Sequence, residues 1–223
     1  MHNDLLRKYW PGLLIALFAM PLLIGLYTSL DVPLTAPYVV LRELMLFGFA
    51  IVLLVLVRKR EGLDWRSIGL QRPSPGKTAL WVLITFVGIA LAAALAFGLI
   101  KLFGWHSSTS DASYFDTLPV PVLCLVILRA GFVEELFYRG YAMERLEALT
   151  GNRVVAFIAP LLLFAVFHYR QGMSGILIAF LMGAVLAGVY VYTRNLWVTI
   201  TTHFLGDFIP NIVLPLFDGA GGQ

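Results

Sequence analysis

The sequence predicts an all-α fold, a polytopic transmembrane bundle of about seven helices with a candidate active site inside the membrane. Of its 223 residues, 60% are hydrophobic and only 13% are charged, whereas ordinary soluble domains carry about 25% charged residues. Three windows contain no charge at all: 9–30, 78–100 and 171–193. Each window reaches the roughly 20 residues that a helix needs to cross the hydrocarbon core of a bilayer.

Four further apolar segments complete the seven helices, and each of them is interrupted by polar residues. They are 36–57 with Arg42 and Glu43, 118–138 with Arg129, Glu134 and Glu135, 153–170 ending in His168, Tyr169 and Arg170, and 196–217 with His203 and Asp207. No long linker separates them, so we expect one transmembrane domain over residues 1–223. We expect Arg42 and Glu43 to pair near the outer boundary. Arg129 could tune Glu134 or extend outward to the interface, and we expect the latter.

The basic residues predict the orientation in the membrane. Twelve of them fall on one side of a seven-helix arrangement, against Lys101 and Arg170 on the other: Arg7, Lys8, Arg58, Lys59, Arg60, Arg66, Arg72, Lys77, Arg139, Arg145, Arg153 and Arg194. The positive-inside rule then places the N-terminus in the cytoplasm. The formal net charge of +3 follows from this topology. No basic cluster interleaved with aromatic residues occurs in a soluble module, so nucleic acid is not an expected partner.

The stretch "GFVEELFYRG" over 131–140 places two adjacent glutamates and an arginine in an apolar helix. Glu135 and Arg139 have the i, i+4 spacing of a helical ion pair, which predicts a structural, supporting role for them. Glu134 comes one residue earlier and points about 100° away from Glu135 around the helix. It is therefore free to face a cavity.

The turns of the chain predict that several polar groups lie at one depth. Gly151 is suited to end a helix, with Glu134 17 residues before it and His168 17 residues after it. At 1.5 Å per residue, both residues lie roughly 25 Å from that turn. A second turn near Arg194 and Asn195 places His203 and Asp207 about 12–18 Å into the membrane, on one helix face. The four groups are expected to form one site.

A charged group at mid-bilayer costs about 2.5–3.5 kcal/mol, so it indicates pairing, a wet cavity or chemistry. A buried glutamate can serve as a general base. His168 can orient the water that Glu134 deprotonates, and His203 with Asp207 can bind an oxyanion. This set suits hydrolysis of an amide. Two other classes stay open, a proton-coupled carrier, although no internal repeat is present, and a non-catalytic membrane partner.

Three motifs carry a resemblance to a known family. "EELFYR" (134–139), "FAVFH" (164–168) and "HFLGD" (203–207) resemble the EExxxR, FxxxH and HxxxN/D motifs of the CPBP family. This family comprises CAAX-type prenyl endopeptidases and bacteriocin-processing proteins, also called Abi proteins. The resemblance covers a catalytic core of about 115–217. The segment 68–77 also resembles the cytoplasmic lead-in of many bacterial members.

The resemblance implies an intramembrane endopeptidase of a bacterial cytoplasmic (inner) membrane. Glu134 and His168 would activate water, while His203 and Asp207 would form the oxyanion site. Glu135 and Arg139 would hold their helix in shape. The substrate would be a membrane-associated protein or peptide, either prenylated at a CAAX-like end or bearing a leader.

Metal dependence stays open between two readings. The chain lacks a compact zinc motif such as HExxH, which favours no cofactor and a metal-independent glutamate protease. Family members have also been described as metalloproteases, and Glu134, His168, His203 and Asp207 could assemble a zinc site from three helices. Asp207 replaces the more frequent Asn of the motif. An ionised Asp207 cannot donate to an oxyanion, so it must be protonated, orient His203, or bind metal.

Overall fold

The computed structural model describes residues 2–72, 74–105 and 118–218. Residues 115–117, at the start of the predicted catalytic core, lie outside this part. Every regular element of the described residues is helical, and no strand occurs among them. The elements are α1 (His2–Ser29), α2 (Ala36–Val55), η1 (Leu56–Arg60), η2 (Trp65–Ile68), α3 (Pro75–Phe103), α5 (Val120–Arg129), η3 (Ala130–Met143), α6 (Glu144–Thr150), α7 (Arg153–Val166), η4 (Tyr169–Gln171), α8 (Gly172–Thr193), α9 (Leu196–Phe208), η5 (Ile209–Val213) and α10 (Leu214–Asp218).

These elements join into seven long helical segments in the described part of the chain, because α2–η1, α5–η3–α6 and α9–η5–α10 are each continuous. Five are long and apolar enough to cross a membrane: Asn3–Ser29, Ala36–Arg60, Pro75–Phe103, Tyr169–Thr193 and Leu196–Phe217. The other two are the charged segment α5–η3–α6 and the shorter apolar helix α7. The predicted multi-pass helical bundle is confirmed.

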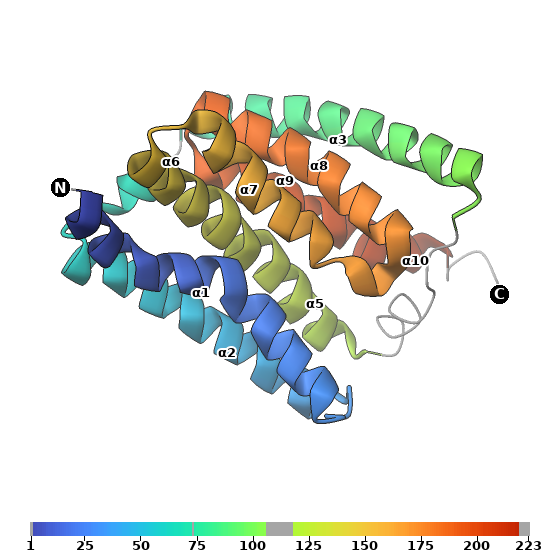
Figure 1. Cartoon of the computed structure of the whole chain (residues 1–223). Coiled ribbons are helices and arrows are strands. Elements are labelled where there is room, and N and C mark those ends of the chain that lie inside the picture. Colours follow the sequence, from blue (N-terminus) through green and yellow to red (C-terminus); the bar gives the residue numbers. More distant parts are fainter. Residues whose placement is uncertain (1, 73, 106–117, 219–223) are drawn as a thin grey trace.

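The helix that carries the two glutamates lies in the middle of the bundle. In Figure 1, α5 and the η3 segment after it run between α1 and α2 on one side and α7, α8 and α9 on the other. The η3 segment packs against α9, α1 and α7. All of its residues except Phe132 are buried. By contrast, α3 packs against α8 and α9 at the edge of the bundle and presents Leu83, Leu91 and Phe97 outward, as a lipid-facing helix does.

The two predicted turns are present, and they lie next to each other. Helix α6 ends at Gly151 with φ +64°, and Asn152 caps α7 by accepting from the amides of Val154 and Val155. Helix α8 ends at Arg194 with φ +48°, and Asn195 caps α9. Because both hairpins start at one level, residues at similar distances from the two turns reach similar depths.

Arg194 ties the two turns together. Its guanidinium donates to Glu144 at 2.6 Å and to Glu147 at 2.9 Å. Arg153 also donates to Glu147, at 2.9 Å. The hydrogen bond from Arg194 is the main cause that holds the pKa of Glu147 below its ordinary value of 4.5, and the bond from Arg153 acts in the same direction.

Helix α7 is shorter than expected. The sequence predicts an apolar helical segment over 153–170, but α7 stops at Val166 and a 3₁₀ turn over Tyr169–Gln171 leads into α8. Gly172, with φ +75°, makes this sharp reversal. The 14 residues of α7 measure about 21 Å. His168 therefore lies just beyond the helix end, in the turn between α7 and α8.

Candidate active site

The η3 segment is a π-helix of 14 residues, an uncommon form that in proteins occurs mostly as single turns and often at functional sites. Two glycines of "GFVEELFYRG" allow its close packing. A Cβ on Gly131 would lie 2.8 Å from the Cβ of Phe204 on α9, and a Cβ on Gly140 would lie 2.9 Å from the Ile68 carbonyl oxygen. These glycines let α9, with its histidine, approach the two glutamates.

Glu134 belongs to a buried chain of charges that reaches α2. Arg129 donates from Nη1 to Oε1 of Glu134 and from Nε to Oε2 of Glu43 at 2.5 Å. Glu43 also accepts from Arg42, with Nη2 at 2.6 Å. The Oε2 atom of Glu134 has no hydrogen-bond partner in the described residues. One oxygen of this carboxylate is therefore anchored, and the other is left for a water or a substrate.

The expected placement of Arg129 was wrong. Its side chain does not extend outward, because it is only 9% exposed and bridges two carboxylates. Arg42 and Glu43 do pair, as predicted, but Glu43 is fully buried and bonds to Arg129 as well. Two carboxylates in the bundle interior attract the guanidinium more strongly than the interface does, because a buried charge without a partner is costly.

Glu135 connects two helices of the site. The predicted i, i+4 ion pair with Arg139 is present, with Nη1 and Oε1 2.8 Å apart. The same Oε1 also accepts from Nδ1 of His203 at 2.8 Å. Glu135 therefore does more than hold its own helix in shape, since it fixes the imidazole of His203 on α9.

Asp207 lies beside the other nitrogen of His203. Its Oδ2 is 3.6 Å from Nε2 of His203, too far for a hydrogen bond. The Asp207 side chain is 41% exposed, against 15% for His203. The group that orients His203 in this structure is therefore Glu135, and Asp207 lies at the open edge of the site.

The imidazole of His168 is oriented by a backbone carbonyl of the preceding helical turn. Its Nδ1 lies 2.7 Å from the carbonyl oxygen of Phe164. Because a carbonyl can only accept, Nδ1 donates, and Nε2 is left for another partner. The Phe164 ring packs on the imidazole, with centroids 4.8 Å apart, and on Tyr138 of η3, with centroids 5.2 Å apart. The three rings join the end of α7 to the glutamate helix.

The structure brings the predicted residues into one region without joining all of them directly. His203 and Asp207 are neighbours on α9, and Asp207 interacts electrostatically with both Glu134 and His168. No hydrogen bond or ion pair between Glu134 and His168 occurs in the part of the chain that the structure describes.

The residues considered as zinc ligands are not gathered into a group that could hold a metal ion in the described part of the chain. No group of three or more His, Cys, Asp and Glu side chains that could hold a metal ion occurs within 2–72, 74–105 and 118–218. Glu134 is paired with Arg129, and Nδ1 of His203 is bound by Glu135. A guanidinium competes with a cation for the same carboxylate oxygens.

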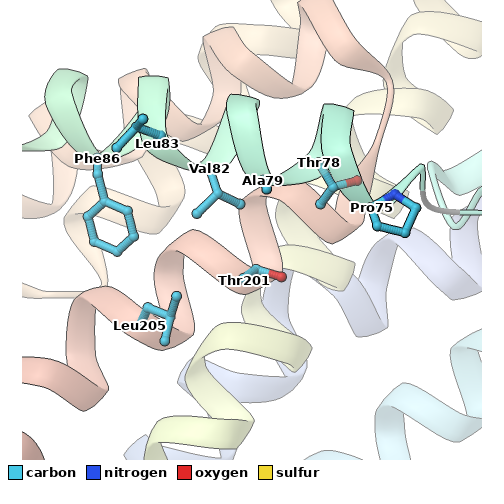
Figure 2. A pocket seen from close by; sticks show the side chains of 8 residues that line it. All are labelled: Pro75, Thr78, Ala79, Val82, Leu83, Phe86, Thr201 and Leu205. Atoms are coloured by element: carbon cyan, nitrogen blue, oxygen red, sulfur yellow. The ribbon is translucent and has the colours of Figure 1, made fainter.

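An apolar groove lies on another face of α9. It has a volume of about 570 Å³ and is lined by Pro75, Thr78, Ala79, Val82, Leu83, Phe86, Thr201 and Leu205. Figure 2 shows Thr201 and Leu205 of α9 facing the residues of α3. His203 and Asp207 follow these two positions by two residues, which turns them to a different side of the helix. The groove is therefore separate from the charged residues.

The comparisons with known proteins give a family match for part of the chain. Residues 116–209 match the family model described as type II CAAX prenyl endopeptidase Rce1-like. The resemblance predicted from the three motifs is confirmed over these residues. The matched residues include Arg129, Glu134, His168, His203 and Asp207.

The chain is also similar to a curated protein. The UPF0177 protein YvdC of Lactococcus lactis subsp. lactis (strain IL1403) is 29% identical over 138 residues, which cover 60% of this chain and 52% of the relative. The chain thus spans about half the length of that relative. No solved structure matches the chain.

The sequence reasoning missed Glu43 as part of the site. Glu43 lies outside the Rce1-like domain, 86 positions before Arg129. The available signal was a glutamate inside an otherwise apolar segment. The sequence does not identify which side chain of another helix lies at the same depth as Glu43. Only the packing of α2 against α5 shows which charge it meets.

Proposed function

We propose that this protein is a metal-independent, glutamate-dependent intramembrane endopeptidase. It hydrolyses a peptide bond of a membrane-associated protein or peptide, prenylated at a CAAX-like end or bearing a leader. The observation that carries the proposal is the state of Glu134. Its carboxylate is buried, Arg129 holds one oxygen, and the other oxygen has no partner in the described residues.

The first step uses Glu134 and His168 to activate a water. Oε2 of Glu134 accepts a proton from the water, while Nε2 of His168 accepts a hydrogen bond from its second O–H. The hydroxide attacks the carbonyl carbon of the substrate, and the carbonyl π electrons move to its oxygen. A base held in a water-poor site is effective, because positioning replaces part of the activation entropy.

The second step needs a donor for the oxyanion. In this proposal Nε2 of His203 carries a proton and donates to the oxyanion, with Glu135 at Nδ1 fixing the ring. Preorganised donors of this kind contribute about 10²–10³ in kcat. Asp207 acts at the open edge of the site, beside Nε2, and contacts the substrate there. The tetrahedral intermediate then collapses, and Glu134 returns its proton to the leaving amine.

The zinc-dependent version of this protease is the alternative. Arg129 already holds Oε1 of Glu134, and the described residues contain no group of three or more His, Cys, Asp and Glu side chains that could hold a metal ion. No observation favours a carrier or a non-catalytic partner over the protease. We further propose that the N-terminus faces the cytoplasm in a bacterial inner membrane. The positive-inside rule supports this orientation, because the basic residues Arg153 and Arg194 lie in two neighbouring turns that ion pairs join.

The test uses purified wild type and Glu134→Gln in detergent with a panel of fluorogenic peptides. The panel contains matched prenylated and unprenylated sequences and leader-bearing peptides. We expect the wild type to cleave at least one member of the panel and Glu134→Gln to cleave none. Equal cleavage by both proteins would contradict the role of Glu134. Cleavage of prenylated peptides alone would define the substrate class.

A further inference from the structure

Arg42 and Glu43 of α2, Arg129 of α5 and Glu134 of η3 form a buried chain of charged side chains. Glu43 is fully buried and accepts on both oxygens, from Arg42 on Oε1 and from Arg129 on Oε2. Arg129 uses Nε for Glu43 and Nη1 for Glu134, and Nη1 also lies 3.6 Å from Sδ of Met20 on α1. The guanidinium is therefore fixed from three helices.

The charges of this chain balance. Arg42 and Arg129 carry two positive charges, and Glu43 and Glu134 carry two negative charges, so the four groups are neutral together. A buried ion pair gains little stability over apolar side chains of similar size, because desolvation offsets the attraction. Stability alone therefore gives no reason for a four-membered chain that ends on the carboxylate of the proposed base.

We propose that Arg129 and Glu43 are positioning residues for Glu134. This inference rests on the proposed function. Glu43 holds the planar fork of Arg129 in one orientation, and Arg129 holds Oε1 of Glu134. Oε2 is then directed to the water in a single rotamer. The catalytic unit accordingly extends to α2, outside the residues 116–209 that match the family.

The test must separate positioning from folding, because removal of Glu43 alone leaves a buried arginine with one partner fewer. We therefore use the double variant Glu43→Gln/Arg129→Gln, which removes one positive and one negative charge. The matched control is Glu61→Gln/Arg145→Gln. That pair is also a buried Arg–Glu pair, with Nε and Oε2 2.8 Å apart, but it contacts none of the proposed catalytic residues.

The first readout is kinetic. We expect the Glu43/Arg129 double variant to fold, with an apparent Tm close to that of the control double variant. Its kcat should fall about tenfold to a hundredfold, because small displacements of a reacting group have effects of that size, while KM stays within about twofold. The control should keep the wild-type kcat. A Glu43/Arg129 variant that keeps wild-type kcat would overturn the inference.

The second readout is independent of cleavage. A hydrophobic carbodiimide modifies protonated carboxyl groups, and mass spectrometry of peptides locates the modified residue. We expect Glu134 to resist modification in the wild type and in the control, and to react in the Glu43/Arg129 variant. Equal modification in all three proteins would overturn the inference. If no substrate is cleaved by the wild type but this difference holds, the proposed function fails and the pairing of Glu134 stands.

Discussion

Nδ1 of His203 lies 2.8 Å from Oε1 of Glu135, so the second glutamate of the EE pair contacts the histidine of another helix. The same oxygen accepts from Arg139 at 2.8 Å. The two adjacent glutamates therefore have different partners, Arg129 for Glu134 and His203 with Arg139 for Glu135. In each carboxylate one oxygen carries these contacts, and in the described residues Oε2 of Glu135 is buried without a hydrogen-bond partner.

Replacement of Glu135 should affect chemistry as well as stability. Glu135→Gln weakens the bond that orients His203 and leaves Arg139 buried without a charged partner, so we expect a loss of about 3–5 kcal/mol in the free energy of unfolding. We also expect kcat of the folded protein to fall about 10²-fold, the usual size for a disturbed oxyanion donor. Circular dichroism melts and kcat per folded molecule measure the two effects.

Arg139→Gln is the matched control for this prediction. It breaks the same buried pair but leaves the contact between Glu135 and His203. We expect a similar loss of stability with kcat much closer to that of the wild type. If the two variants lose kcat equally, the orienting role of Glu135 is wrong.

A methyl group on Gly131 should push α9 away from the glutamates. The added Cβ would lie 2.8 Å from the Cβ of Phe204 and 3.0 Å from its Cα, and a backbone atom cannot move aside cheaply. We expect Gly131→Ala to lower Tm and kcat together, with overpacking costing about 1–3 kcal/mol. Gly98→Ala in α3, where nothing lies within 4 Å, should change neither. An unchanged Gly131→Ala protein would contradict the close packing of η3 on α9.

Two tyrosines one helical turn apart should respond differently to loss of their hydroxyl groups. The Tyr141 hydroxyl donates to Glu61 and lies 3.3 Å from the Tyr9 carbonyl oxygen. The buried Tyr138 hydroxyl has no hydrogen-bond partner within the described ranges. We expect Tyr141→Phe to destabilise the protein by about 1–3 kcal/mol, since it leaves a buried carboxylate with a partner fewer. Tyr138→Phe should leave Tm unchanged, and a clear loss in that variant would contradict the structure.

The link between the turns at Gly151 and Arg194 should depend on pH. The pKa of Glu147 is lowered from 4.5, chiefly by Arg194. Its contribution to stability is therefore complete above about pH 4.5, and it is lost as the pH falls through the lowered pKa. We expect the Tm difference between wild type and Glu147→Gln to be largest near neutral pH and to shrink in acid. An exposed pair of this kind contributes at most about 1 kcal/mol. A difference that grows in acid would contradict the ion pair.

The sequence predicts the local features of this fold well. Gly151 and Arg194 end their helices where the turn residues indicate, and each is followed by an asparagine that caps the next helix. These signals work because capping and positive φ depend on neighbouring residues alone.

The site itself depends on contacts that are distant in sequence. Glu43 and Arg129 are 86 positions apart, and Glu135 and His203 are 68 apart. These pairs form because each helix is rotated about its axis so that the two side chains face each other, and because η3 is π-helical. A pattern of hydrophobic residues predicts neither feature. The end of α7 at Val166 was also missed, because no glycine or proline directly follows it and the reversal comes only at Gly172.

The central claim is that the Glu134 carboxylate, and no metal ion, activates the water. The most direct measurement compares kcat of wild type and Glu134→Gln on one cleaved peptide, each with and without a strong chelator. We predict that chelation leaves wild-type kcat unchanged and that Glu134→Gln loses at least about 10³-fold, within the range for general base catalysis together with its positioning. Wild-type cleavage that disappears with chelator and returns with zinc would contradict the account.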